Sequence, residues 1–187
     1  MNEEKFWQLI QIAHEQSNGD MDAKCESVKA AINGLSNEDA ATFSSIFDDM
    51  MDRSYTWSLW GAAYVMSGGC SDDSFTDFRS SLISRGKQSF DKSILNPDSL
   101  ANEEFDEDAW YFEGFQYAIT ESVETVVGSV PTRKTPHLDE PSGEPWEEDP
   151  EELKIKYPNL WVSFKHIWST PPPPTSTTKS KPWWKIW

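Results

Sequence analysis

Residues 68–79, GGCSDDSFTDFR, gather several side chains that could do chemistry. They include a thiol at Cys70, adjacent carboxylates at Asp72 and Asp73, and a guanidinium at Arg79. Carboxylates can bind Mg²⁺ or act as general acid and base, and an arginine can orient an anion. One hypothesis for the function is therefore an enzyme or small-ligand binder that uses Asp72, Asp73 and Arg79.

The same residues also form a good helix start. Ser71 can accept a backbone N–H as the N-cap, and each acid in the first turn gains about 0.3–1 kcal/mol from the helix dipole. Neighbouring residues point about 100° apart on a helix, so Asp72 and Asp73 are poorly placed to share one metal. Arg79 lies about 10 Å along the axis from Asp72, and we expect its partner to come from another helix. Helix initiation is the favoured interpretation.

Cys70 is a candidate nucleophile, because a helix N-terminus lowers the pKa of a thiol. Such a thiol normally needs a histidine base. His14 is the candidate, since His137 lies in an acidic segment and His166 near the tail. Cys25 falls on an apolar stripe, which indicates the core. The chain contains no CxxC, HExxH or glycine-rich phosphate motif, so we expect no metal and no cofactor.

Apolar residues recur every three or four positions through the first 130 residues, a spacing that predicts amphipathic helices. The segment YTWSLWGAAYVM is apolar nearly all round, which indicates a helix enclosed by the others. With no convincing alternating strand, the predicted fold is an all-α bundle of six to seven helices. The stripes are Phe6, Leu9, Ile10 and Ala13; Met21, Cys25, Val28, Ile32 and Leu35; Ala40, Phe43, Phe47 and Met50; Phe75, Phe78 and Leu82; and Phe112, Phe115, Ile119 and Val126.

The character of the chain changes after this helical part, residues 1–130. Residues 131–168 begin with a segment rich in proline and acid, which predicts an extended connector. Asp149 and Pro150 then suit the start of a helix. A second short helix beginning at Pro158 is expected to dock on the bundle. Residues 169–187 form a Pro/Thr/Lys spacer that ends in WWKIW, and we expect this tail to be disordered.

The formal net charge of −16 limits the classes of partner that the protein is expected to bind. Phosphate backbones and anionic lipids are bound mainly through Lys and Arg, so we expect no nucleic-acid partner. An acidic surface suits a basic protein partner or simply confers solubility. The N-terminus has acids where a signal peptide is basic, and no apolar run reaches the roughly 20 residues of a membrane span. We therefore expect a cytoplasmic protein.

The tail offers a second candidate contact. Exposed tryptophans are costly unless they are used, and three uses stay open. The tail can insert as a peptide into a partner's groove, rest weakly at a membrane interface, or fold back on its own acidic body. The expected anchors are Trp183, Trp184, Ile186 and Trp187.

The sequence also resembles the bacterial family called domain of unknown function 4240. The resemblance rests on FWQLI near the start, on YTWSLWGAAYVMSGGCSDDSFTDFRSSLISRGKQSF with NPDSLA, and on GEPWEEDPEELKIKYPNLW, covering about residues 6–164. Ser81 stands where the family pattern has an aromatic residue. The resemblance implies a compact helical cytoplasmic domain that includes the connector and the PNLW helix, and it brings no activity or cofactor. A shared site would lie among Trp60, Tyr64, Cys70, Ser71, Asp72, Asp73, Phe78 and Arg79.

The sequence thus favours a non-enzymatic, acidic protein-interaction module of regulatory, adaptor or toxin-neutralising type. The tryptophan-rich tail would be its second contact. The carboxylate and arginine site is the alternative.

Overall fold

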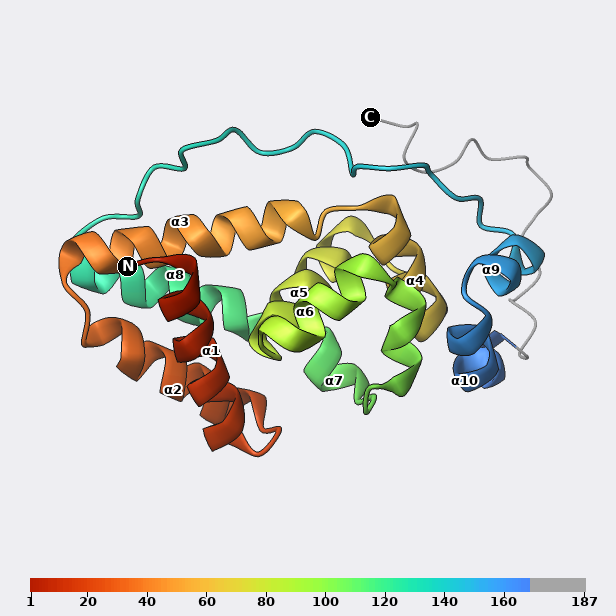
Figure 1. The fold of residues 1–187 in the computed structure, drawn as a ribbon, viewed down its shortest axis with the longest axis horizontal. Coiled ribbons are helices and arrows are strands. Elements are labelled where there is room, and N and C mark those ends of the chain that lie inside the picture. The colour runs from red at the N-terminus through yellow and green to blue at the C-terminus, as the bar shows by residue number, and fades with distance from the viewer. Residues whose placement is uncertain (169–187) are drawn as a thin grey trace.

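The computed structural model describes residues 1–168, and over that part the protein is all-α, as the periodicity predicts (Figure 1). The predicted tail, with Trp183, Trp184, Ile186 and Trp187, lies outside the described residues. The helices are, in chain order, α1 (Glu3–Ser17), α2 (Met21–Asn33), α3 (Asn37–Arg53), α4 (Trp57–Ser67), α5 (Asp72–Ser84), α6 (Lys87–Leu95), the 3₁₀ helix η1 (Pro97–Asn102), α7 (Glu107–Trp110), α8 (Gly114–Val127), α9 (Pro150–Lys156) and α10 (Pro158–Trp168).

Side-chain caps set the starts of the long helices. The side chains of Asp20, Ser36 and Ser71 accept hydrogen bonds from backbone N–H groups in the first turns of α2, α3 and α5. Each cap replaces a partner that the first turn of a helix lacks. The helix start predicted at Ser71 is therefore confirmed.

Aromatic rings fill the centre of the molecule. Trp60 and Phe75 stack with their ring centroids 4.9 Å apart, and Phe78 stacks on Trp110 at 5.4 Å. The first contact joins α4 to α5, and the second joins α5 to α7. Large rings bury much apolar area for each side chain, which lets a modest hydrophobic fraction build a core.

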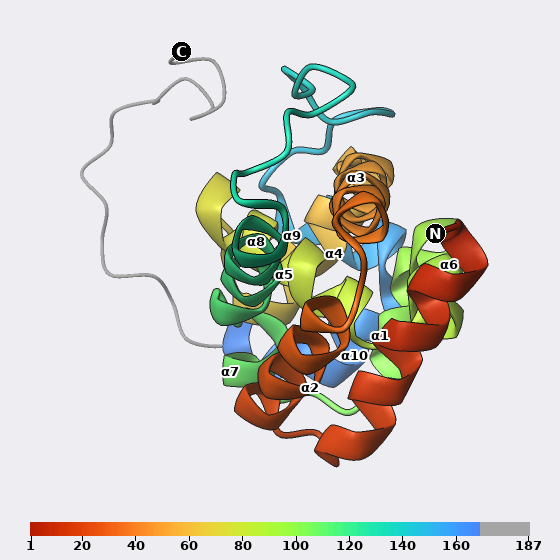
Figure 2. The same cartoon turned by 90° about the vertical axis from the view of Figure 1, so that its left-hand side faces the viewer.

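Helix α5 lies at the centre of the fold and packs against α1, α3, α4, α6, α7 and α8. α1, α2, α3 and α8 pack together, η1 packs against α4 and α6, and α6 also lies next to α1 (Figures 1 and 2). α10 packs against α4 and η1. Among the described helices, none combines the length and apolar character that a bilayer crossing requires.

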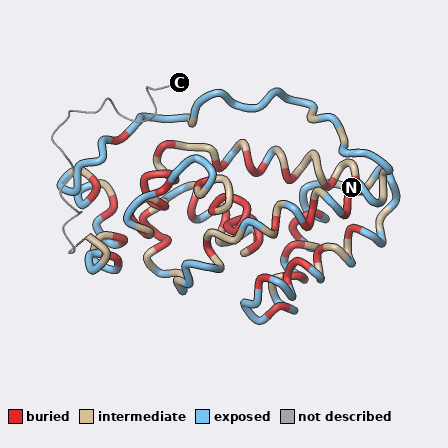
Figure 3. Tube along the Cα trace, turned by 180° about the vertical axis from the view of Figure 1, so that it is seen from behind, coloured by how far each residue is buried: buried red, intermediate tan, exposed pale blue. Residues whose placement is uncertain are grey.

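The connector, residues 129–149, contains no helix and runs back along α3 toward α4 (Figure 1). The backbone of Ser142 bonds to Tyr55 and Trp57, at 3.0 Å and 2.9 Å. Most of the connector is exposed (Figure 3). Trp146, however, is buried beside Tyr64, with ring centroids 4.7 Å apart. The connector is thus anchored at its C-terminal end by one large side chain.

Candidate functional site

A pocket of about 290 Å³ opens between α3, α5, α8 and the connector. Its charged side chains come from segments far apart in the sequence: Asp48 and Asp52 from α3, Asp72 and Arg79 from α5, and Arg133 with His137 from the connector. The pocket is the place where the structure brings together two of the side chains singled out in the sequence, Asp72 and Arg79.

Arg79 lines this pocket and is only 8% exposed. Its Nη1 donates to the Met51 carbonyl at 3.0 Å, and its Nη2 donates to Thr76 Oγ1 at 2.9 Å. The guanidinium also lies over the Tyr55 ring, 4.5 Å from its centroid. Within residues 1–168, no carboxylate forms an ion pair with it. The expected partner from another helix is therefore the backbone of α3.

Asp72 acts on the pocket through Tyr55. Burial raises the pKa of Tyr55, and the charge of Asp72 and a hydrogen bond to its carboxylate raise that pKa further. The phenol therefore keeps its proton and can donate a hydrogen bond to the Asp72 carboxylate. Asp72 thus has two roles: it stands in the first turn of α5 and also lines the pocket.

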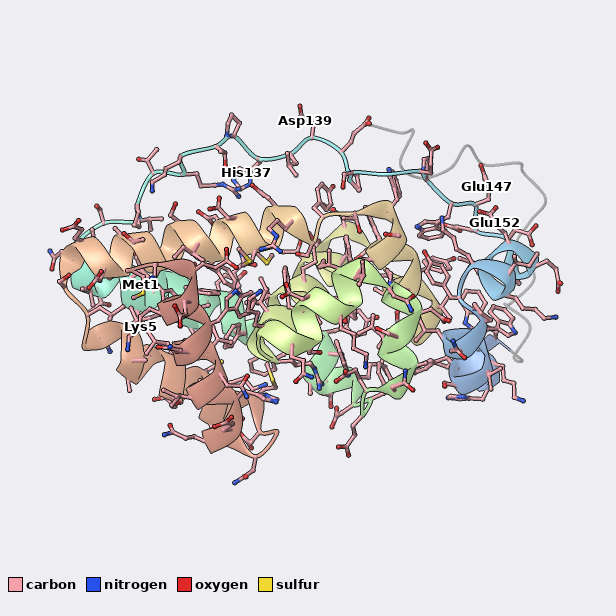
Figure 4. The ribbon with its side chains drawn as sticks, in the orientation of Figure 1. Met1, Lys5, His137, Asp139, Glu147 and Glu152 are labelled. Atoms are coloured by element: carbon pink, nitrogen blue, oxygen red, sulfur yellow. The ribbon has the colours of Figure 1, made fainter. Side chains whose placement is uncertain are left out.

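Arg133 enters the pocket from the connector side. Its Nη2 lies 2.6 Å from Asp52 Oδ2 and its Nε 4.0 Å from Asp48 Oδ2. Its Nη1 lies 2.9 Å from His137 Nδ1. His137 is placed between the connector and α3, whereas Asp139 points away from the body (Figure 4). The connector thus holds one arginine against two acids that lie one turn apart on α3.

Asp48 is only partly compensated by this arginine. Burial raises its pKa, Arg133 lowers it, and the neighbouring Asp52 raises it again, with a net upward shift. A carboxylate in this state gains from any further cation that approaches it.

Asp73 does not line this pocket and faces a neighbouring hollow with Asp77 and Glu113. Burial, helped by the charges of Glu113 and Asp73, raises the pKa of Asp77 to about 6. Among the described residues, no group of histidine, cysteine and carboxylate side chains is arranged to hold a metal ion. The predicted trio Asp72, Asp73 and Arg79 is thus divided between two hollows.

Residues 1–125, which include helices α3 and α5, match the family model described as "Protein of unknown function (DUF4240)". The chain belongs to the DUF4240 family. No match was found among curated proteins or solved structures. The DUF4240 match includes the pocket residues Asp48, Asp52, Asp72 and Arg79 but ends before Arg133. Residues 126–164, where the sequence also resembled the family, lie outside it.

The structure corrects the proposed nucleophile of this DUF4240 protein. Burial raises the pKa of Cys70 to about 12, where a helix N-terminus was expected to lower it. Its backbone carbonyl accepts the Trp60 indole N–H at 2.9 Å. Burial lowers the pKa of His14 on α1, and the charges of Lys24 and Arg85 lower it further. Among the described residues no hydrogen bond joins Cys70 to His14, so the candidate pair is not formed.

Tyr64 was also expected near the carboxylates, and it does not line the pocket. It packs against Trp146 and Trp168. The residues that sequence reasoning missed in the pocket are Arg133 and the pair Asp48 and Asp52. The spacing of Asp48 and Asp52 could have indicated a shared acidic surface, since residues four apart lie on the same face of a helix. Only the fold could bring Arg133 to it.

Proposed function

We propose that this protein is an acidic, non-enzymatic interaction module whose pocket receives the basic side chain of a protein partner. The supporting observation is Arg133, because its guanidinium already lies against Asp52 and Asp48. It is presented by an extended segment, the form in which a partner's basic peptide would reach the same acids. Regulatory, adaptor and toxin-neutralising roles all use such a surface, and we keep the cytoplasm as the expected location.

In this proposal a partner's arginine replaces Arg133. The connector near Arg133 is mostly exposed, and its backbone bridge to the body comes nine residues later, at Ser142. Replacing one guanidinium by another preserves the ion pairs, so the exchange carries little electrostatic cost. The incompletely compensated Asp48 adds a gain when the partner brings a second cation.

The experiment measures binding of a fluorescent peptide of alternating arginine and serine by anisotropy at low salt. Asp52→Asn should weaken binding about tenfold, in the range for a charge-assisted pair. Asp49→Asn, an exposed position on the same helix with the same charge change, is the matched control. We expect it to change affinity less than twofold.

Arg133→Ala should have the opposite effect on the affinity for the peptide. Removing the internal competitor should tighten peptide binding, because the acids are then free. Equal losses in the Asp52 and Asp49 variants would show that the peptide responds only to net charge, and the proposal would be wrong.

A second candidate is the binding of a small molecule, with or without a reaction, and the observation that favours it is the meeting of Asp72 and Arg79 in one pocket. Such a ligand would carry an ammonium group for Asp72 and a carboxylate for Arg79. Calorimetric titration of the protein with free amino acids tests this second candidate. Binding that Asp72→Asn abolishes and Asp73→Asn leaves intact supports it.

We also propose that the tail makes a second contact with the partner, through Trp183, Trp184, Ile186 and Trp187. A pull-down experiment compares how much of a basic protein partner the full chain recovers from a cell extract with how much a chain ending at Ser169 recovers from the same extract. Reduced partner recovery supports a tail contact, and equal recovery removes it.

A further inference from the structure

Arg79, which lines the pocket, keeps unused hydrogen-bond donors although more than nine-tenths of it is buried. A guanidinium has five N–H bonds. Three of them are donated, to the Phe75 carbonyl, the Met51 carbonyl and Thr76 Oγ1, at 3.4 Å, 3.0 Å and 2.9 Å. These acceptors are all neutral, and the other two N–H bonds have no acceptor in residues 1–168. A buried cation in this state is stabilised by an anion that reaches it through the pocket.

The helices around Arg79 limit where such an anion can lie. Nη1 faces the Met51 carbonyl in the last turn of α3, where the negative end of the helix dipole repels an anion. Nη2 faces Thr76 on α5, away from that end. Asp72 precedes Thr76 by one turn on the same face of α5 and would repel a simple anion. The ligand must therefore carry an N–H donor for Asp72 next to the anionic group that it offers to Nη2.

The same pocket also marks a place for a guanidinium. Arg133 lies against Asp52 and Asp48, but only its Nη2 is within hydrogen-bond distance of these acids. Its Nε is buried and has no hydrogen-bond partner in the described part of the chain. An arginine that is not tied to the connector can form the bidentate pair with a carboxylate that Arg133 lacks. Asp52 directly follows Met51, to which Arg79 donates, so the two places are neighbours in one hollow.

The size of the pocket limits what can occupy both places. Its volume of about 290 Å³ lies at the lower end of the range of about 300–1,000 Å³ for ligand sites, which suits a single residue. An arginine inside a chain brings only amide groups to Arg79 and leaves its charge uncompensated. An arginine at the end of a chain brings a carboxylate, and its own amide N–H lies next to that carboxylate.

We propose that the pocket binds the C-terminal arginine of the protein partner. Its guanidinium would pair with Asp52 in place of Arg133. Its carboxylate would accept from Arg79, and its amide N–H would donate to Asp72. This inference rests on the proposed function and specifies which residue of the partner enters the pocket.

The test compares two fluorescent tripeptides of two serines followed by arginine, one with a free C-terminal carboxylate and one amidated. Anisotropy at low salt measures the affinity of the full chain for each. Net charge alone favours the amide, because the protein carries a charge of −16 and amidation removes a negative charge from the peptide. The proposal gives the opposite order. The free acid should bind about tenfold more tightly, in the range for a charge-assisted pair.

Arg79→Gln should remove this preference for the free acid. Arg53→Gln is the matched control, since it makes the same charge change at an exposed position on α3 whose ion pairs are with Glu3 and Asp91. We expect it to keep the preference. The comparison of the two peptides in the wild-type protein decides the matter even if Arg79→Gln does not fold.

An amide that binds as tightly as the acid, or a preference for the acid that survives in Arg79→Gln, would overturn the inference. If both peptides then still lose affinity in Asp52→Asn, the proposed function stands without it. If Asp52→Asn changes neither affinity, the proposed function itself fails. Free arginine that binds as tightly as the tripeptide acid would assign the pocket to an amino acid and overturn its assignment to a partner's C-terminus.

Discussion

Asp98 of η1 caps α10 from a distance of 61 positions in the sequence. Its carboxylate accepts from the backbone N–H groups of Asn159 and Leu160 at 3.0 Å and 2.9 Å, and from Asn159 Nδ2 at 2.6 Å. One buried side chain therefore supplies the acceptors that the first turn of α10 lacks. It fixes this helix to the body.

Replacing Asp98 should loosen that attachment. Asp98→Ala leaves the backbone N–H groups of Asn159 and the buried Leu160 without their acceptor, and we expect a loss of about 1–3 kcal/mol in the free energy of unfolding, measured in urea. Asp98→Asn keeps one acceptor oxygen and should lose less. Asp139→Ala, on the exposed face of the connector, should stay within about 0.5 kcal/mol. A loss for Asp98→Ala no larger than for Asp139→Ala contradicts the prediction.

Gly61→Ala should destabilise the protein, although alanine is normally the better helix residue by about 1 kcal/mol. A Cβ atom at Gly61 would lie 3.0 Å from Trp146 Cδ1 and would also collide with the Tyr157 hydroxyl. Overpacking of this kind costs about 1–3 kcal/mol. Urea unfolding checks the sign, and Gly34→Ala, where a Cβ meets nothing closer than 3.5 Å, is the control. Greater stability in Gly61→Ala would show that Trp146 is not packed against α4.

Asp52→Asn should free the N-terminal part of the connector, because it removes the 2.6 Å ion pair with Arg133. For a half-buried pair worth about 1 kcal/mol, the open population rises about fivefold. Cleavage after the exposed Lys134 by a lysine-specific protease measures this population, and neither substitution changes the cleavage site. Asp49→Asn should cleave at the wild-type rate. Equal rates for both variants would show that Arg133 does not hold the connector.

Asp77 should make stability depend on pH. Its folded pKa of about 6 lies above the ordinary value of 3.8, so the folded state binds the proton more tightly. This contribution is fully present below about pH 4 and is lost as the pH rises through about 6. Above that, Asp77→Asn should be the more stable by about 1 kcal/mol, a figure reduced for its partial exposure. Unfolding at pH 4 and pH 7.5 measures this, and an unchanged difference between the two pH values contradicts it.

The sequence by itself determined the helical class and several helix starts, because caps and apolar periodicity act within one turn or a few. Ser71 and Asp20 cap the turns that follow them whatever packs outside. The short elements η1 and α7 were not visible in the same way, since they have too few residues to show a period.

Only the tertiary structure decided the candidate site. Arg79 was expected to find a partner on another helix, but the choice of the Met51 carbonyl depends on how α3 and α5 pack. Arg133 and Asp52 are 81 positions apart, and no local rule connects them. The same holds for Cys70, whose pKa follows its burial in the fold rather than its place beside a helix start. Local hydrogen bonds fix where a helix begins, whereas the charge and solvation of a side chain depend on whatever the fold brings to it.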